Sequence, residues 1–379
     1  VMNTSHSRTL STTPAPTTPA PLGNRSSNVA MIAVDLAKNV FELAQADSEG
    51  RIVQRLRLSR AAFAAHLHAQ PPCRWVLEAC GSAHHWARQL IAQAHQVTLL
   101  PPQYVRAYRL RNKTDHADCA ALLEAVKNTQ IHPVPIKTQY QQTLQGLHRM
   151  RSQWMGTRTA RINELRGLLG EMGLIMPQGA AKALAQVPAL LAQGVSDGSL
   201  PPVLAEGLQL LVAEIRELET RVVDVERKLS ALTRELPDVA RLQQISGIGL
   251  LTATALYSRA GSAGYFRNGR HFASWLGLTP REHSSGQKRQ LGGISKRGDG
   301  YVRMLLMHGA RAVLQQALKL HQAMPQRLSY LQRWVVGIEQ RRGYNKATAA
   351  LANKLARIAW ASWRHDRVFD GNYALGNVV

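Results

Sequence analysis

Two carboxylates three residues apart, Asp115 and Asp118, stand at the start of an Ala/Leu-rich stretch that runs to about residue 127. Residues three apart on a helix project from the same face, so this stretch predicts a helix with both acids on one side. First-turn acids also stabilise a helix by complementing the positive end of its dipole. The residues alone therefore leave open a structural and a catalytic role, beside the cations Arg111 and Lys113.

Two further acids lie at the ends of predicted strands. Asp35 closes the apolar run 29–34, and Glu78 follows the short apolar segment 74–77. Alternation of apolar runs, turns and helical stretches predicts the order β-β-β-α-β-α-β-α. The predicted strands are 29–34, 40–46, 51–58, 74–77 and 97–100, and the helices are about 60–69, 83–95 and 115–127.

This order predicts a mixed sheet flanked by helices, the arrangement of the ribonuclease H-like nucleases. Asp35 and Glu78 would then lie on neighbouring strands, with the last helix bringing Asp115 and Asp118 to face them. Four oxygen donors suit Mg²⁺ or Mn²⁺ rather than zinc. Two such ions can activate the attacking oxygen and stabilise the leaving oxygen in phosphodiester chemistry. Each acid also has a structural alternative as a turn former or helix cap.

Charge and composition limit the classes of partner. The chain has 379 residues, with 47 Lys+Arg against 24 Asp+Glu and a formal net charge of +23. Such an excess favours binding to a polyanion, most commonly nucleic acid. No apolar run approaches 18 residues, which argues against a membrane span. Three cysteines without CxxC spacing argue against a disulfide framework and against structural zinc.

The middle of the chain is predicted to be helical. A seam of apolar residues alternates in steps of four and three over more than four heptads, as in a coiled coil. An earlier helix, about 142–173, has a weaker apolar stripe and many arginines. The two helices could form a hairpin within one chain or pair between subunits; so strict a seam favours an oligomer, and a simple spacer is the alternative. The seam residues are Leu204, Leu208, Leu211, Ile215, Leu218, Val222, Val225, Leu229, Leu232 and Leu236.

Two motifs of the C-terminal region could contact phosphate. Gly247 and Gly249 form a Gly-Ile-Gly turn between two predicted helices, which leaves backbone N–H groups free at a helix N-terminus. Ser284 and Ser285 precede Gly286 in a loop with several cations, which could hold a phosphodiester. From the residues alone, a phosphate-binding loop is favoured over a serine nucleophile. The cations are Arg281, Lys288, Arg289, Lys296 and Arg297.

The order and spacing of four blocks resemble the DEDD transposases related to the Piv-type DNA invertases, which are insertion-sequence recombinases guided by a bridge or seeker RNA. The resemblance extends from Val29 to about Trp363. The blocks are residues 33–38, ending in Lys38, residues 77–81, residues 113–118, and a C-terminal set comprising the Gly-Ile-Gly turn, 277–280, 284–286 and 294–298.

This resemblance implies a RuvC-like N-terminal domain in which Asp35, Glu78, Asp115 and Asp118 form the metal-binding tetrad. It also implies a C-terminal transposase domain whose serine attacks DNA and forms a covalent phosphoserine link. The motif serine is Ser285, with the adjacent Ser284 as second choice. In the family, the tetrad of one subunit and the serine of another form a composite site, and the RNA selects donor and target DNA by base pairing.

The expected organisation is therefore an α/β RuvC-like domain, a helical coiled coil and a mostly α C-terminal domain with a helix-hairpin-helix-like element. The predicted boundaries are a disordered tail over 1–27, then 28–141, 142–236, 237–364 and a tail over 365–379. We expect a homo-oligomer, dimer or tetramer, in a prokaryotic cytoplasm and associated with the nucleoid. The alternative functions are a RuvC-type metal-dependent junction nuclease and a non-catalytic nucleic-acid-binding scaffold. The residues expected to bind nucleic acid are Lys38, Arg111, Lys113, Gly247, Gly249, Arg281, Lys288, Arg289, Lys296 and Arg297.

Overall fold

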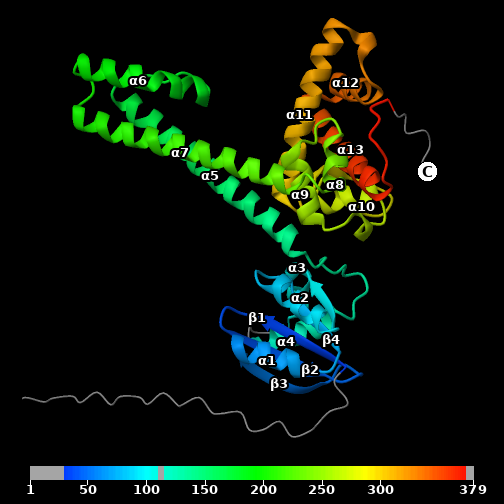
Figure 1. Cartoon of the computed structure of the whole chain (residues 1–379). Coiled ribbons are helices and arrows are strands. Elements are labelled where there is room, and N and C mark those ends of the chain that lie inside the picture. Colours follow the sequence, from blue (N-terminus) through cyan, green and yellow to red (C-terminus); the bar gives the residue numbers. More distant parts are fainter. Residues whose placement is uncertain (1–29, 110–114, 373–379) are drawn as a thin grey trace, which may run out of the picture. The chain divides into compact units, whose positions relative to one another are not determined.

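The computed structural model describes residues 30–109 and 115–372, with the side chain of Asp115 outside that description. The chain divides into two compact units at Val134/Pro135 (Figure 1). The predicted contacts of Arg111 and Lys113 lie outside the described residues. In the part of the chain that is described, no helix is long and apolar enough to cross a bilayer.

The first unit is built on a five-stranded mixed sheet in the order β3-β2-β1-β4-β5. β1 pairs antiparallel with β2 and parallel with β4, which confirms that Asp35 and Glu78 come from neighbouring strands. The predicted order of strands and helices is also confirmed. The elements are β1 (Met31–Leu36), β2 (Val40–Ala46), β3 (Ile52–Ser59), α1 (Arg60–Ala69), β4 (Arg74–Glu78), α2 (Ala83–Ala92), β5 (Gln96–Leu100), α3 (Pro102–Val105), η1 (Arg106–Tyr108) and α4 (Asp115–Ala125).

The two faces of this sheet differ in the size of their side chains. One face and its covering helices contain the aromatic residues Phe41, Phe63, Trp75 and Trp86, whose rings meet edge to face. The other face carries small residues, and α4 packs there with its own buried residues. Small side chains let a helix approach a sheet closely. That core includes Ala33, Ala44, Ala46, Cys119, Ala121, Leu122 and Ala125.

The second unit begins with a long helical hairpin. α5 (Gln139–Glu171) and α7 (Pro202–Leu232) run side by side, as Figure 1 shows. Three ion pairs between the helices show their relative direction. As the residue number of the arginine on α5 rises, the residue number of its glutamate on α7 falls. Arg151 lies 2.7 Å from Glu226, Arg158 contacts Glu219 at 2.5 Å, and Arg161 lies 2.9 Å from Glu214. The two helices are therefore antiparallel within one chain.

The seam of α7 is the surface that packs inside this hairpin. Six of its ten predicted residues are buried: Leu208, Ile215, Leu218, Val222, Val225 and Leu229. Gly194, Gly198 and Pro201-Pro202 predict that residues 179–202 only connect the two long helices. The structure corrects this prediction, because the segment contains another helix, α6 (Ala180–Ser196), which packs on α5 and α7. Gly194 is needed there, since an added Cβ would lie 2.7 Å from the side chain of Leu174.

The rest of the second unit is mostly helical around one large core. The expected helix, Gly-Ile-Gly turn and second helix are present as α8 (Pro237–Gln243), the turn and α9 (Leu250–Ala260). The remaining elements are η2 (Ala263–Tyr265), α10 (Gly269–Trp275), β6 (Pro280–Glu282), β7 (Leu291–Ile294), α11 (Gly300–Ala323), η3 (Pro325–Arg327), α12 (Tyr330–Arg342) and α13 (Tyr344–Arg364).

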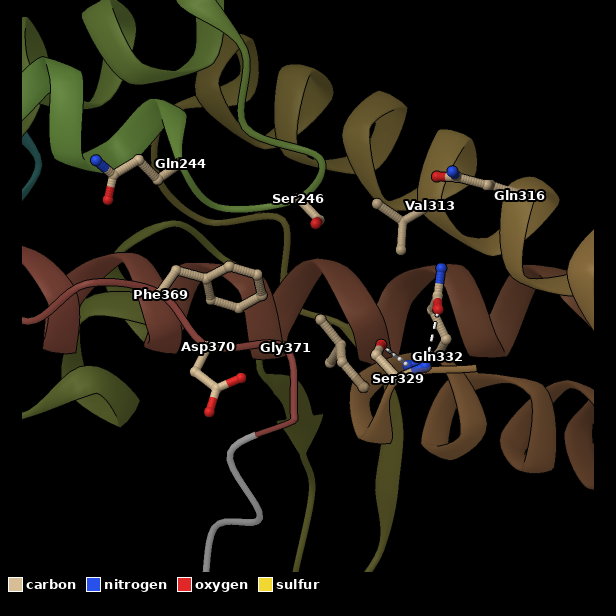
Figure 2. Close-up of a pocket in the computed structure, with 10 residues that line it drawn as sticks. Gln244, Ser246, Val313, Gln316, Ser329, Gln332, Phe369, Asp370 and Gly371 are labelled. Atoms are coloured by element: carbon tan, nitrogen blue, oxygen red, sulfur yellow. Dashed lines mark hydrogen bonds between the residues drawn. The ribbon is translucent and has the colours of Figure 1, made fainter. Parts of the chain in front are cut away.

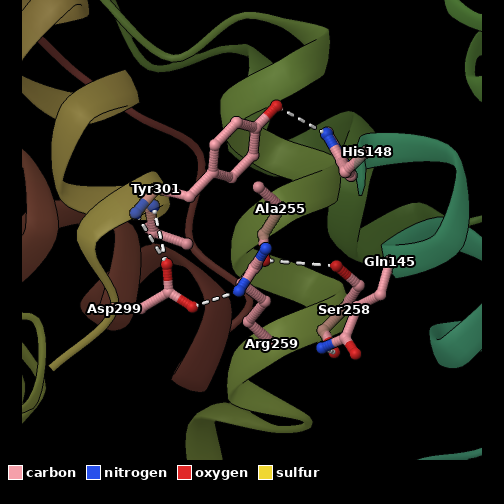
Figure 3. A network of polar contacts seen from close by, with 8 residues as sticks. Gln145, His148, Ala255, Ser258, Arg259, Asp299 and Tyr301 are labelled. Atoms are coloured by element: carbon pink, nitrogen blue, oxygen red, sulfur yellow. Dashed lines mark hydrogen bonds and ion pairs between the residues drawn. The ribbon is translucent and has the colours of Figure 1, made fainter. Parts of the chain in front are cut away.

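A buried polar network joins α5, α9 and α11 (Figure 3). His148 Nδ1 lies 3.0 Å from the Tyr301 hydroxyl, and its Nε2 lies 2.8 Å from Thr254 Oγ1. Because the Thr254 hydroxyl donates to Leu250 O at 2.7 Å, it accepts from His148 Nε2–H. Nδ1 then accepts from Tyr301. This arrangement holds His148 as the neutral Nε2–H tautomer.

Asp299 ties the same network to the start of α11. Its carboxylate accepts hydrogen bonds from Tyr301 N at 2.9 Å and Val302 N at 3.0 Å, and it forms an ion pair with Arg259. The Arg259 guanidinium also lies over the Tyr301 ring, 5.2 Å from its centroid. One carboxylate thus caps α11 and connects it to α9.

Replacement of Gly309 by alanine should disrupt the second unit. A Cβ at this position of α11 would lie 1.9 Å from Gly247 O, a backbone atom that side-chain motion cannot move. We expect Gly309→Ala to lower the free energy of unfolding by about 3 kcal/mol or more. Gly337→Ala is the matched control, because no atom lies within 4 Å of its added Cβ in α12. The control should be neutral or stabilising by about 0.5–1 kcal/mol in urea unfolding. Equal stability of the two variants would contradict this packing.

Because His148 is buried as a neutral side chain, we expect the protein to lose stability in acid. Burial, followed by the charges of Arg259 and Arg151, lowers its pKa from 6.5 to about 4. The unfolded chain therefore takes up a proton below its ordinary pKa while the folded protein does not. The free energy of unfolding is therefore unaffected by the titration of His148 above pH 6.5. It falls as the pH drops from 6.5 toward 4, by up to about 3 kcal/mol. In urea unfolding between these pH values, His148→Gln should show a shallower loss than wild type. Identical slopes would contradict the assignment.

Candidate active site

Three carboxylates form a row across the sheet of the first unit. Asp35 on β1 lies directly opposite Glu42 on β2. Val34 on β1 pairs with Leu77 on the parallel strand β4. Asp35 and Glu78 each follow these residues, so they lie at the same level of the two strands. Alternate residues of a strand share a face, and neighbouring strands lie about 5 Å apart. Asp35, Glu42 and Glu78 therefore belong to the face that also carries Ala33, Ala44 and Val76, where α4 packs.

α4 is attached to this row at its first turn. His116 Nδ1 lies 2.8 Å from Glu42 Oε1, and the side chain of Glu42 is 6% exposed. Arg55 on β3 donates to His116 O at 3.2 Å. One turn further along, the buried Cys119 thiol donates to Glu42 O at 3.2 Å. These contacts attach α4 to β2 and β3.

Cys119 also reports the electrostatics of the site. Burial above all, together with the neighbouring carboxylates of Asp35 and Glu42, raises the pKa of its thiol to about 12, against the lowering effects of a backbone hydrogen bond with Asp35 and of the Arg55 charge. The thiol therefore stays protonated at neutral pH and serves as a hydrogen-bond donor. An inert thiol suits a packing role rather than a nucleophile.

Asp118 lies on α4 with a cationic partner. Its Oδ1 is 2.7 Å from Arg109 Nε, and both side chains are largely shielded from solvent, at 15% and 18% exposed. Asp115 is the first residue of α4, one helical turn before Cys119. Within residues 30–109 and 116–372, no three His, Cys, Asp or Glu side chains lie close enough together to hold one metal ion. The described part brings Asp35 and Glu78 into one row but does not gather the full tetrad around one point.

The predicted serine loop is a β-hairpin in the second unit. β6 and β7 are its strands, and Ser285 and Lys288 form the last backbone pair before the tip, with N···O distances of 3.3 and 3.1 Å. Gly286 provides the left-handed turn, with φ +56°. The whole tip is exposed. Two glycine contacts hold its base: an added Cβ on Gly277 would lie 2.0 Å from Arg297 O, and one on Gly298 would lie 2.0 Å from Trp275 O.

The hairpin distinguishes its two serines. The Ser284 hydroxyl donates to Glu282 Oε1 at 2.8 Å and accepts from Gln290 N–H at 3.2 Å. These bonds give Ser284 a structural role in the hairpin. In the described part of the chain, the Ser285 hydroxyl forms no hydrogen bond. Ser285 thus presents an exposed hydroxyl without a competing intramolecular partner.

The cations predicted to bind phosphate are exposed on and beside this hairpin. Arg289 lies 3.4 Å from Glu282. No carboxylate of the described residues forms an ion pair with Arg281, Lys288, Lys296 or Arg297. In the first unit Lys38 is exposed, and its carbonyl accepts a hydrogen bond from Arg60 at 3.3 Å. Four of the cations predicted to bind phosphate therefore lie exposed on or beside the serine hairpin without an ion pair to a described carboxylate.

The Gly-Ile-Gly turn has two different glycines. Gly247, with φ +88°, faces α11, where its Cβ would lie 2.9 Å from Val313 and 3.0 Å from Gly309 O. Gly249 caps α9 and has no atom within 4 Å of an added Cβ, so its surroundings are open. Gly247 is thus explained by packing, and Gly249 lies at the accessible end of α9.

Three residues around the tetrad were missed by sequence reasoning: Glu42, Arg109 and His116. Glu42 carried a detectable signal, because it is the single acid inside the mostly apolar strand 40–46. Arg109 and His116 carried none, since their partners Asp118 and Glu42 are identified only by tertiary contacts. Glu42 adds a carboxylate to this face, Arg109 supplies positive charge beside Asp118, and His116 contacts Glu42.

Comparison with known families agrees with both halves of this description. Residues 32–173 match the IS110-type DEDD family, described as "Transposase". Residues 239–324 match the family described as "Transposase IS116/IS110/IS902 family". The first match contains the sheet and α4, and the second contains the Gly-Ile-Gly turn and the serine hairpin.

Full-length relatives carry the same description. A "Probable family 20 transposase" from Pseudomonas aeruginosa is 43% identical over 335 residues, covering 88% of this chain and 96% of the relative. The "Transposase for insertion sequence element IS1111A" of Coxiella burnetii is 36% identical over 88% of this chain and 89% of its own. The "Transposase for insertion sequence element IS1328" of Yersinia enterocolitica is 36% identical over 90% and 99%. The chain therefore belongs to the IS110 family of transposases, enzymes of DNA strand transfer.

Proposed function

We propose that this transposase cuts and rejoins DNA with two sets of groups, a carboxylate tetrad and a serine hydroxyl. The tetrad is Asp35, Glu78, Asp115 and Asp118 of a RuvC-like domain, and the hydroxyl is that of Ser285. The observation that carries the proposal is the row of Asp35, Glu42 and Glu78 under α4, because it places acids from distant segments on one face. The free hydroxyl of Ser285 beside unpaired cations supports the second half.

The donor set of the tetrad fits Mg²⁺ or Mn²⁺. All four side chains offer carboxylate oxygens, which hard divalent cations prefer. Such a cation would polarise the scissile phosphate and lower the pKa of the attacking hydroxyl. Asp118 already shares its charge with Arg109 at 2.7 Å, so Asp118 must exchange this partner for the metal ion. Arg109 would then be free to contact a phosphate oxygen.

Ser285 is proposed as the nucleophile. Its Oγ attacks the phosphorus atom and loses its proton, while the bond to the departing 3′ oxygen breaks and that strand end leaves as a hydroxyl. The phosphoserine link conserves one phosphodiester until an incoming 3′ hydroxyl displaces the serine. The cations Arg281, Lys288 and Arg289 would stabilise the charge on the phosphoryl oxygens. Ser284 is less suited, because its hydroxyl already donates to Glu282.

Nucleic-acid recognition is proposed to combine charge with a guide. The net charge of +23 favours binding to phosphates. Contacts from Lys38, Arg111, Lys113, Lys296, Arg297 and the turn at Gly249 would be independent of sequence. Target choice would then come from a bridge or seeker RNA that pairs with donor and target DNA. The enzyme would act in a prokaryotic cytoplasm as a homo-oligomer, with the tetrad of one subunit serving the serine of another.

Covalent trapping tests the nucleophile. With transposon-end DNA, Mg²⁺ and the RNA transcribed from the element, wild type should form a protein–DNA adduct that maps to Ser285 by mass spectrometry. Ser285→Ala should lower adduct formation and strand exchange by about a thousandfold or more, whereas Ser284→Ala should retain the adduct. Asp118→Asn should abolish both readouts while DNA binding persists.

Other patterns of result identify the alternatives. Normal cleavage by Ser285→Ala without an adduct would indicate a RuvC-type nuclease. Normal strand exchange by Asp118→Asn without metal dependence would indicate that the acids are structural. Full activity without RNA would contradict guidance and leave the serine chemistry standing.

The tetrad requires α4 to stay attached to the sheet, and His116 is expected to maintain that attachment. His116→Ala leaves the buried Glu42 beside Asp35 without its partner, which should destabilise α4 by about 2–3 kcal/mol despite the higher helix propensity of alanine. Cys119, fully buried on α4, should then react with iodoacetamide at least about tenfold faster. Peptide mass spectrometry separates its alkylation from that of Cys73 and Cys80.

Glu124→Ala is the matched control on the same helix. Its ion pair with Lys127, at 2.8 Å, has both side chains about half exposed, at 56% and 48%. Such surface pairs contribute about 0–1 kcal/mol, so Cys119 reactivity should change little. Equal Cys119 reactivity in His116→Ala and wild type would show that Glu42–His116 does not hold α4.

A further inference from the structure

A cavity of about 480 Å³ lies in the second unit beside the Gly-Ile-Gly turn. Figure 2 shows that four segments surround it. Gln244 and Ser246 come from the end of α8 and the turn, Gln316 from α11, and Ser329 from the start of α12. Phe369 and Asp370 come from the segment after α13. Its size falls in the range of small-ligand sites, about 300–1,000 Å³.

The segment after α13 is held against the cavity by backbone contacts. Leu331 N donates to Gly371 O at 3.1 Å, and Arg367 N donates to Ser362 O at 3.2 Å. Phe369 is partly buried against the core, whereas the preceding Val368 is 75% exposed. The aromatic ring is therefore a fixed wall of the cavity.

The lining offers hydrogen bonds without positive charge. Among the described residues, no Lys or Arg lines the cavity. The side chains of Gln244, Ser246 and Gln316 form no hydrogen bond to any described residue, so their donors and acceptors are available. Ser329 is already used, because its hydroxyl caps α12 at Gln332 N. Asp370 adds a carboxylate, whose Oδ1 already accepts from Asn372 N at 2.8 Å, so its Oδ2 is the further acceptor.

This lining fits a flat, neutral, hydrogen-bonding ring. A phosphate is disfavoured by Asp370 and by the missing cations, and an aliphatic ligand would leave the amides unsatisfied. A nucleobase has a face that stacks on an aromatic ring and edge groups that pair with glutamine amides. The carboxylate can accept from an exocyclic amino group.

We propose that this cavity receives one unstacked nucleobase of the nucleic acid that the transposase holds, stacked on Phe369 and read by Gln316 and Gln244. The inference rests on the proposed function of the Gly-Ile-Gly turn as a phosphate contact. Ser246 lines the cavity and directly precedes Gly247, so the cavity adjoins the turn at which the phosphate contact is proposed. Enzymes that do chemistry on a base show that a pocket can hold an unstacked base by stacking and by hydrogen bonds to its edge.

Affinity for an unpaired base tests the proposal. The probe is a fluorescent duplex of 20 base pairs with one central bulged 2-aminopurine, compared with the same duplex without the bulge, each as DNA and as RNA. Full-length wild type should bind one bulged probe about tenfold more tightly than its paired form, with a change in 2-aminopurine emission. The nucleic acid that shows this preference identifies the source of the base.

Variants separate the cavity from general binding. Phe369→Ala and Gln316→Ala should remove the bulge preference and leave affinity for the paired duplex unchanged. Gln316 is exposed on α11, so its variant preserves the fold even if loss of the Phe369 ring disturbs packing. Val368→Ala should retain the preference. Wild type without any bulge preference, or a preference that survives in both cavity variants, would overturn the proposal. If wild type did not bind the paired duplex at all, that result would instead count against the proposed nucleic-acid binding of the enzyme.

Discussion

Crowding of like charge on one face of the sheet is the constraint on which the first unit depends. Asp35, Glu42 and Glu78 lie on three neighbouring strands and on one face, so each carboxylate raises the energy of the next. Two of the acidic side chains have partners close by: His116 contacts Glu42, and Arg109 forms an ion pair with Asp118. Alanines on the same face allow α4 to come close enough for these contacts. The metal ion proposed for this face would add positive charge among the same carboxylates.

The serine hairpin differs from this face in both exposure and charge. Its tip is exposed and carries cations that no described carboxylate neutralises, apart from the contact of Arg289 with Glu282. The base of the hairpin is held in place by close packing, because Gly277 and Gly298 allow two backbone segments to touch. A small hairpin on a fixed base can present one hydroxyl to a phosphate while its strands keep their register. The carboxylates and the hydroxyl thus belong to separate compact units.

Local patterns predicted most of the fold, because apolar runs and turns of the first unit reflect its strands directly. The positions of Asp35 and Glu78 followed from the same runs. Contacts between distant residues could not be predicted. The pairing of His116 with Glu42 depends on how α4 lies on the sheet, and the difference between Ser284 and Ser285 depends on the pleat of the hairpin. α6 was hidden because its helix contains Pro188 and Gly194, residues that usually end helices.

The seam of α7 shows how a strong periodic signal can be correct about a helix and leave its partner open. Six of the ten predicted positions are buried against neighbours within the same chain. In α5 the facing residues in the middle are not leucines; Arg151 and Arg158 reach Glu226 and Glu219 there. Charged pairs of this kind fix direction and register, because a shifted or parallel arrangement would leave them unmatched. Since the hairpin already occupies the seam, the periodic signal is explained by packing within one chain, and the expected oligomer stays a prediction.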